Sequence, residues 1–136
     1  MQFGWSVLSG AKPAFPGSFL ITHRGLSENF VQLRAWLGQN RAIARRWSDE
    51  LGHDLASASV LSDLMLAAAR AANRDGITLF SSQNPAHIRR NAALLRDDAL
   101  LATGASFAQL VARDAALIRQ PMQEHFNADR PAPIYE

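Results

Sequence analysis

The sequence predicts an α/β fold in which a few parallel strands alternate with helices. Three apolar runs with strand character, at residues 2–8, 19–22 and 77–80, are bounded by glycine, proline or polar turns. Between and after them, apolar residues recur every three or four positions, which is the period of an amphipathic helix. Strands that alternate with helices favour a layered architecture with a parallel sheet. Three strands are few for a complete parallel sheet, because both of its faces need cover.

The first two strands are separated by a loop rich in proline. Residues 2–8 are apolar, and Gly10 ends this run. The segment "AKPAFPGS" at 11–18 follows, and its prolines and glycine indicate a loop. Residues 19–22 form the second expected strand, and the turn "HRGL" comes directly after it.

Two short helices are expected next. The first runs from Ser27, a residue type that caps helix N-termini, to Leu37, and Gly38 breaks it. Asn40 caps the second helix, and Gly52 closes it at the position where glycine commonly ends a helix.

A longer helix leads into the third strand, and two more helices follow that strand. Ser57 or Ser59 opens the longer helix, and the turn "NRDG" leads into strand 77–80. The later helices are expected at 85–95 and from about 104 to 119. The helical spacing turns these residues inward: Phe30, Leu33, Leu37, Ile43, Trp47, Leu51, Val60, Leu61, Leu64, Met65, Ala68, Phe107, Leu110, Val111 and Ile118.

The composition is that of one globular domain. The chain has 136 residues, of which 48% are hydrophobic and 19% charged, and a formal net charge of +2. This charge is too small to recruit nucleic acid through a global field. The lack of cysteine excludes disulfides and thiolate metal sites. No run approaches the ~20 apolar residues of a membrane span, and no signal peptide is recognisable, so a cytoplasmic protein is expected. Lys12 is the only lysine, which together with abundant alanine suggests a GC-rich bacterial genome.

The stretch "GITLFSSQNPAHIRRN" at 76–91 combines a strand, a serine turn and a basic helix start. Asn84 and Pro85 occupy the preferred N-cap and first helical positions. A helix N-terminus has unpaired N–H groups and a partial positive charge, so such a turn is a ready phosphate site. The same residues are also what an ordinary capped helix contains. Both interpretations stay open at this point.

Other constellations favour structural roles. The histidines show no spacing typical of a metal site. Asp97–Asp98 and Asp49–Glu50 are interpreted as helix-end or surface charges. The basic segment "RAIARRW" at 41–47 is interpreted as a solvated helix face rather than a nucleic-acid contact. Three tryptophans are interpreted as packing residues: Trp5, Trp36 and Trp47.

Three motifs in order resemble the C-terminal part of the aldo/keto reductases. "DELGHDLASASVLSDLMLAAARAANRDGITLFSSQNPAHIRRNAALL" follows that family's order of helix, strand eight and phosphate turn, and "QFGWSVL" and "FLITHRGLSENF" look like strands six and seven. The resemblance covers roughly residues 1–96. It implies a partial (β/α)8 TIM barrel over residues 1–120, with about three parallel strands, five or six helices and an extended tail at 121–136.

The resemblance also implies a site for NADP or NAD, with NADP favoured. The strand-six glutamine that bonds the nicotinamide carboxamide falls on Gln2, and the stacking aromatic falls on His23. The remaining positions are the pyrophosphate loop at Arg24, Gly25 and Leu26, the 2′-phosphate turn at Ser81, Ser82 and His87, and the adenine contacts at Arg90 and Asn91. Three of these depart from the family pattern: Ser81 stands for a lysine, His23 for a tyrosine and Arg90 for a glutamate.

The family's catalytic Asp, Tyr, Lys and His lie on the first half of the barrel, which has no counterpart in the sequence. The resemblance therefore implies that the chain alone does not reduce carbonyls and that its partner is the coenzyme, with a missing N-terminal half or a second copy as a further partner. No membrane or nucleic-acid partner is expected. A helical α/β interaction module that associates through exposed strand edges is the alternative. A phosphate-binding domain without catalysis is a third.

Overall fold

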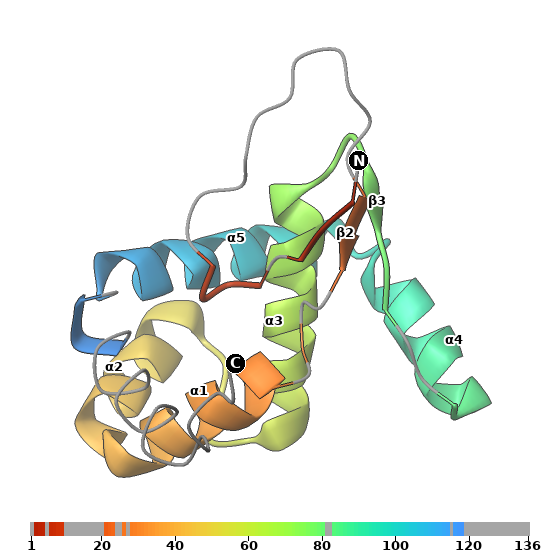
Figure 1. The fold of residues 1–136 in the computed structure, drawn as a ribbon. Coiled ribbons are helices and arrows are strands. Elements are labelled where there is room, and N and C mark those ends of the chain that lie inside the picture. Colours follow the sequence, from red (N-terminus) through yellow and green to blue (C-terminus); the bar gives the residue numbers. More distant parts are fainter. Residues whose placement is uncertain are drawn as a thin grey trace, which may run out of the picture.

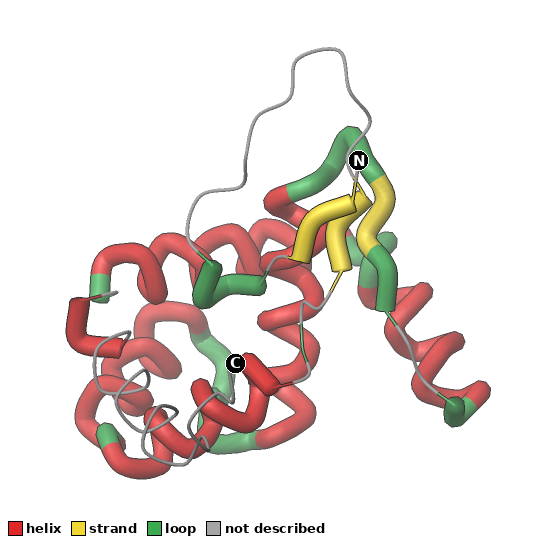
Figure 2. Tube along the Cα trace, viewed as in Figure 1, coloured by secondary structure: helices red, strands yellow, loops and turns green. Residues whose placement is uncertain are grey.

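The computed structural model describes residues 2–4, 6–9, 21–23, 26, 28–80, 83–114 and 116–118. Within these ranges the chain forms three strands and five helices, and the helices dominate (Figures 1 and 2). In chain order these elements are β1 (Gln2–Gly4), β2 (Ile21–His23), α1 (Glu28–Gln39), α2 (Arg41–Leu51), α3 (Ala58–Ala72), β3 (Ile77–Thr78), α4 (Pro85–Leu94) and α5 (Asp98–Arg113). None of the helices in these ranges is long and apolar enough to cross a bilayer.

The three strands form one parallel sheet in the order β1-β2-β3, which confirms the predicted α/β class with parallel strands. Buried Asn73, at the end of α3, fixes the sheet to the helices. Its Nδ2 donates to Thr22 Oγ1 at 3.3 Å and to the Ile77 carbonyl at 3.1 Å. The Leu79 N–H also donates to the Thr22 carbonyl at 2.8 Å, so the β2–β3 pairing extends past β3 itself.

The first and third strands are shorter than expected, and β2 includes His23, which was expected in the turn that follows it. The first expected strand ends at Gly4 rather than at residue 8, because the serines that follow form a turn. Ser6 N–H donates to Ser9 Oγ at 2.9 Å, and Leu8 N–H donates to Ser6 Oγ at 3.2 Å. Serine side chains compete in this way with sheet hydrogen bonds. The proline loop at 11–18 and the tail at 121–136 lie outside the described residues.

Several predicted helix ends are confirmed. Gly52 adopts a left-handed conformation, with φ of 69°, and its N–H donates to the Ser48 carbonyl at 2.8 Å. Ser57, rather than Ser59, caps α3 by accepting from the Val60 N–H. Ser27, the expected cap of α1, lies outside the described residues.

Three predicted boundaries are wrong, and one of them is the end of the last helix, since α5 ends at Arg113 with Asp114 as its C-cap and not at about residue 119. Gly38 does not end α1, which continues to Gln39. The last helix begins at Asp98 and not at about Gly104, because Asp97 caps it by accepting from the Leu100 N–H at 3.1 Å. Asp98 then places a negative charge in the first turn, where the helix dipole favours it.

Helix α3 is the centre of the molecule, and the other helices and the sheet are arranged around it (Figure 1). Its residues 64–69 are all buried. The main core also holds Trp47 and Phe107, which are fully buried, so the packing role predicted for Trp36 and Trp47 is confirmed. Helix α4 contacts the body through α3 and projects away from it (Figure 1).

Candidate functional site

The carboxyl ends of β1 and β2 are adjacent, and the predicted nicotinamide contacts belong to these two strands. The register pairs Gly4 with His23 and Gln2 with Ile21. Gln2 therefore lies two residues before the level of His23, a separation of about 7 Å along the strand direction. The side chains of Gln2 and His23 lie outside the described part of the structure, so their predicted contact with one nicotinamide ring stays a prediction.

The predicted phosphate contacts are only partly described. Arg24, Gly25, Ser81 and Ser82 lie outside the described residues. Leu26 is described, and its side chain is partly buried and packs against the main core. A contact of Leu26 with a pyrophosphate would therefore use its backbone.

The N-terminus of α4 is capped by its own asparagine. Asn84 Oδ1 accepts from the Ala86 N–H at 2.9 Å, as the sequence predicts. The Ile88 N–H donates to the Asn84 carbonyl at 3.1 Å, and Pro85 has no N–H. Among the described residues, the His87 N–H is then the one first-turn donor left for a ligand. This capping leaves fewer backbone N–H groups at the helix end for a phosphate. Phosphate binding there would therefore depend more on the hydroxyls of Ser81 and Ser82.

Of the side chains predicted to reach the 2′-phosphate and the adenine, three are described, and all three belong to α4. His87 and Arg90 are exposed and Asn91 is half-buried. The Arg90 guanidinium donates to Asp63 Oδ2 at 2.6 Å and so ties α4 to α3. This ion pair occupies part of the N–H donor set of the Arg90 guanidinium. A coenzyme could bind only the donors that Asp63 does not use.

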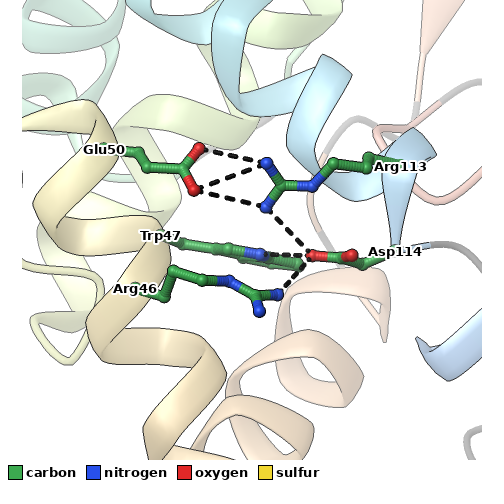
Figure 3. Close-up of polar contacts among 5 residues, drawn as sticks. All are labelled: Arg46, Trp47, Glu50, Arg113 and Asp114. Atoms are coloured by element: carbon green, nitrogen blue, oxygen red, sulfur yellow. Dashed lines mark hydrogen bonds and ion pairs between the residues drawn. The ribbon is translucent and has the colours of Figure 1, made fainter.

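The strongest polar cluster of the described residues joins α2 to the end of α5 (Figure 3). Asp114 Oδ2 accepts from Trp47 Nε1 at 2.8 Å, Arg46 Nη2 at 3.0 Å and Arg113 Nη2 at 3.4 Å. Arg113 also pairs with Glu50 at 3.2 Å. Burial acts to raise the pKa of Asp114, but the hydrogen bonds from Trp47 and Arg113 and the neighbouring positive charges outweigh it and lower that pKa below its ordinary value. Because three donors converge on the Asp114 carboxylate and Arg113 also reaches Glu50 on α2, we interpret this cluster as a structural clamp.

The clamp makes the free energy of unfolding depend on pH in the acidic range. The folded-state pKa of Asp114 lies below its unfolded value of about 3.9, so the stabilisation is complete above that pH and is lost as pH falls through the folded-state pKa. We expect Asp114→Asn to lower the free energy of unfolding by about 1.5–3 kcal/mol at pH 7, the range for hydrogen bonds to charged groups. Urea unfolding from pH 7 down to pH 3 measures this.

The same series on Asp75→Asn is the control, since Asp75 is exposed and has no ion-pair partner among the described residues. We expect this variant to retain the acid dependence of the wild type, whereas Asp114→Asn should flatten it. An Asp114→Asn protein that still loses stability in acid as steeply as the wild type would contradict the assignment.

The sequence interpretation missed a basic cleft beside α2. The cleft has a volume of about 860 Å³, and Arg34, Arg41 and Arg45 line it together with His53. The segment 41–47 was expected to be a solvated face. The four-residue interval between Arg41 and Arg45 was the available signal, because it places both guanidinium groups on one side of α2.

Comparisons of the chain with protein-family models, curated proteins and solved structures found no match. Over the described ranges, no group of three or more His, Cys, Asp or Glu residues is arranged to hold a metal ion.

Proposed function

We propose that this chain is the coenzyme-binding C-terminal portion of an oxidoreductase similar to the aldo/keto reductases. It would form part of a (β/α)8 barrel and hold NADP or NAD at the carboxyl ends of its strands. In the whole enzyme, hydride transfer to a carbonyl would use acid–base residues outside this segment. A positioned general acid of this kind typically contributes about 10²- to 10⁴-fold in rate, so we expect the chain alone to be inactive.

The arrangement of strands is the observation that carries this proposal. The three strands are parallel, and strands that are neighbours in the sheet are also consecutive along the chain. Each pair is therefore joined by a crossover connection. Consecutive strands of a (β/α)8 barrel have this order, and its ligands bind at the carboxyl ends of the strands. Helix α4 begins seven residues after Thr78, so its capped N-terminus lies close along the chain to the carboxyl end of β3.

A thermal melt with and without NADPH tests this proposal, with NADH as the comparison. A coenzyme that binds only the folded chain adds about 2.7 kcal/mol of stability at a hundredfold excess over Kd. We expect the midpoint to rise by several degrees, at roughly 2–8 °C per kcal/mol for chains of this size range. The shift should be larger with NADPH than with NADH.

The variant His87→Ala/Asn91→Ala locates the binding. Neither side chain has a hydrogen-bond or ion-pair partner among the described residues, so the double change should leave the unliganded midpoint in place and remove most of the shift. Arg74→Gln, at an exposed turn that precedes the amino end of β3, should keep the full shift. A wild-type melting midpoint that neither coenzyme changes would contradict the proposal.

A second candidate function rests on exposed apolar side chains. Ile77 and Leu79, in and just after the edge strand β3, are 43% and 46% exposed, and Ile88 on α4 is 42% exposed. Unpaired strand edges with apolar side chains invite pairing with another chain. An interaction module without coenzyme affinity would show a cooperative melt unchanged by NADPH together with a concentration-dependent oligomer in light scattering.

A further inference from the structure

The lining of the basic cleft comes from α1, α2 and the connection that follows α2. These two helices lie on the other side of α3 from α4 (Figure 1). Its volume of about 860 Å³ is within the range of about 300–1,000 Å³ typical of small-molecule sites. Two alanines, Ala44 and Ala56, contribute apolar surface to the lining above the nearly covered Leu37 and Leu55, and three arginines contribute charge. An apolar surface next to a few strong polar groups is the usual composition of a ligand pocket.

The arginines of this cleft have no carboxylate partner. Arg34, Arg41 and Arg45 form no ion pair with any described residue, although Arg46, beside them on α2, pairs with Asp114 at 3.0 Å. Two acidic residues also line the cleft. The Asp54 carboxylate accepts the Ala56 N–H at 3.0 Å, and Asp49 lies one helical turn beyond Arg45 without an ion pair to it.

The charges of α2 run against its own dipole, which supports a ligand role for these arginines. Arg41 occupies the first turn, which carries no acidic residue, whereas Asp49 and Glu50 lie in the last turn. Helix dipoles favour the opposite distribution, and like charges at the i, i+4 interval of Arg41 and Arg45 repel each other. Asn40 gives no side-chain cap, since its Nδ2 donates to the Trp36 carbonyl at 2.8 Å instead. A bound anion would offset the repulsion between Arg41 and Arg45 and would interact favourably with the N-terminal end of α2, although it would gain nothing from the carboxylates of the last turn.

We propose that the cleft binds a small organic phosphate, an ester with one or more phosphate groups and a body the size of a nucleoside. A planar guanidinium group can donate two parallel hydrogen bonds to a phosphate. The apolar part of the cleft lining can contact the organic part of the ligand. The compact cleft and the net charge of +2 favour a small ligand over a nucleic-acid strand, which needs an extended basic groove. This site is separate from the coenzyme site and does not depend on it.

Isothermal titration calorimetry with inorganic pyrophosphate and with uridine monophosphate tests the proposal, and uridine is the uncharged control. We expect saturable binding of both anions, tighter binding of uridine monophosphate because its body contacts the apolar lining, and no binding of uridine. Arg41→Gln/Arg45→Gln should weaken both affinities at least about tenfold, the minimum for losing one charge-assisted hydrogen bond.

Arg74→Gln/Arg89→Gln is the matched control, because it removes two exposed arginines that lack carboxylate partners among the described residues and do not line the cleft. It should bind both anions as the wild type does. The cleft variant should melt at the wild-type midpoint or above it, because it removes like-charge repulsion, so a loss of binding is not a loss of folding. No saturable binding, uridine monophosphate binding no tighter than pyrophosphate, or equal weakening in both double variants would each overturn the proposal.

Discussion

Gly104→Ala is expected to destabilise the protein by about 2–3 kcal/mol, although alanine is the better helix former by about 1 kcal/mol. Gly104 is buried in the middle of α5, where this helix crosses α3. A Cβ atom at this position would lie 2.6 Å from the Ala67 carbonyl carbon, 2.6 Å from the Ala68 nitrogen and 2.7 Å from the Ala67 Cβ. Non-bonded atoms of these kinds settle at about 3.5–4.0 Å, so the two helix backbones would have to separate.

Urea unfolding followed by far-UV circular dichroism measures this loss, and Gly38→Ala is the matched control. Gly38 is also helical, but it is exposed, and a methyl group added there would meet nothing outside its own stretch of helix within 4 Å. There the propensity gain acts alone, and we expect stabilisation of up to about 1 kcal/mol. Opposite signs for the two glycines would establish close approach of α3 and α5 at Gly104. Stabilisation by both changes would mean that α5 does not contact α3 there.

Local chemistry explains which elements the sequence could predict. Gly52 needs a left-handed conformation and Ser57 supplies a cap oxygen, so both helix ends follow from the residues beside them. The start of α5 also has a local signal, because Asp97 caps it, but the helix was expected to begin only at about residue 104. Glycine usually weakens a helix, whereas Gly104 lies inside α5 in close approach to Ala67 and Ala68, more than thirty residues earlier. Packing between distant segments decided that position against local propensity.

The candidate sites divide in the same way. Asn84 and Pro85 predicted the N-terminus of α4 correctly, because capping is local. The Arg90–Asp63 pair spans 27 residues and the Trp47–Asp114 hydrogen bond 67, and neither interval leaves a periodic signal in the sequence. The basic cleft is an intermediate case. The sequence shows that its two arginines share one face of α2. It does not show that α1 and residues 52–56 pack beside this face and make it concave.

The largest loss is expected for Trp47→Ala, at about 3–5 kcal/mol. Trp47 is fully buried between two other rings of the main core. Its ring centroid lies 5.9 Å from that of Trp36 and 6.2 Å from that of Phe107, the latter in an edge-on arrangement at 73°. Such pairs contribute about 0.5–1.5 kcal/mol beyond the area they bury. A chain of this length has a total stability of about 7–20 kcal/mol, so the variant loses a large part of it.

Trp47→Phe separates the ring from the hydrogen bond. Phenylalanine keeps the aromatic contacts with Trp36 and Phe107 and removes the N–H that Asp114 accepts at 2.8 Å. Asp114 retains Arg46 and Arg113, so we expect a smaller loss of about 1–2 kcal/mol. Urea unfolding of both variants separates the stability that comes from the aromatic contacts from the stability that comes from the hydrogen bond. A loss for Trp47→Phe as large as for Trp47→Ala would show that the polar clamp, rather than the aromatic core, holds α2 against α5, whereas wild-type stability in Trp47→Ala would contradict the burial of Trp47 altogether.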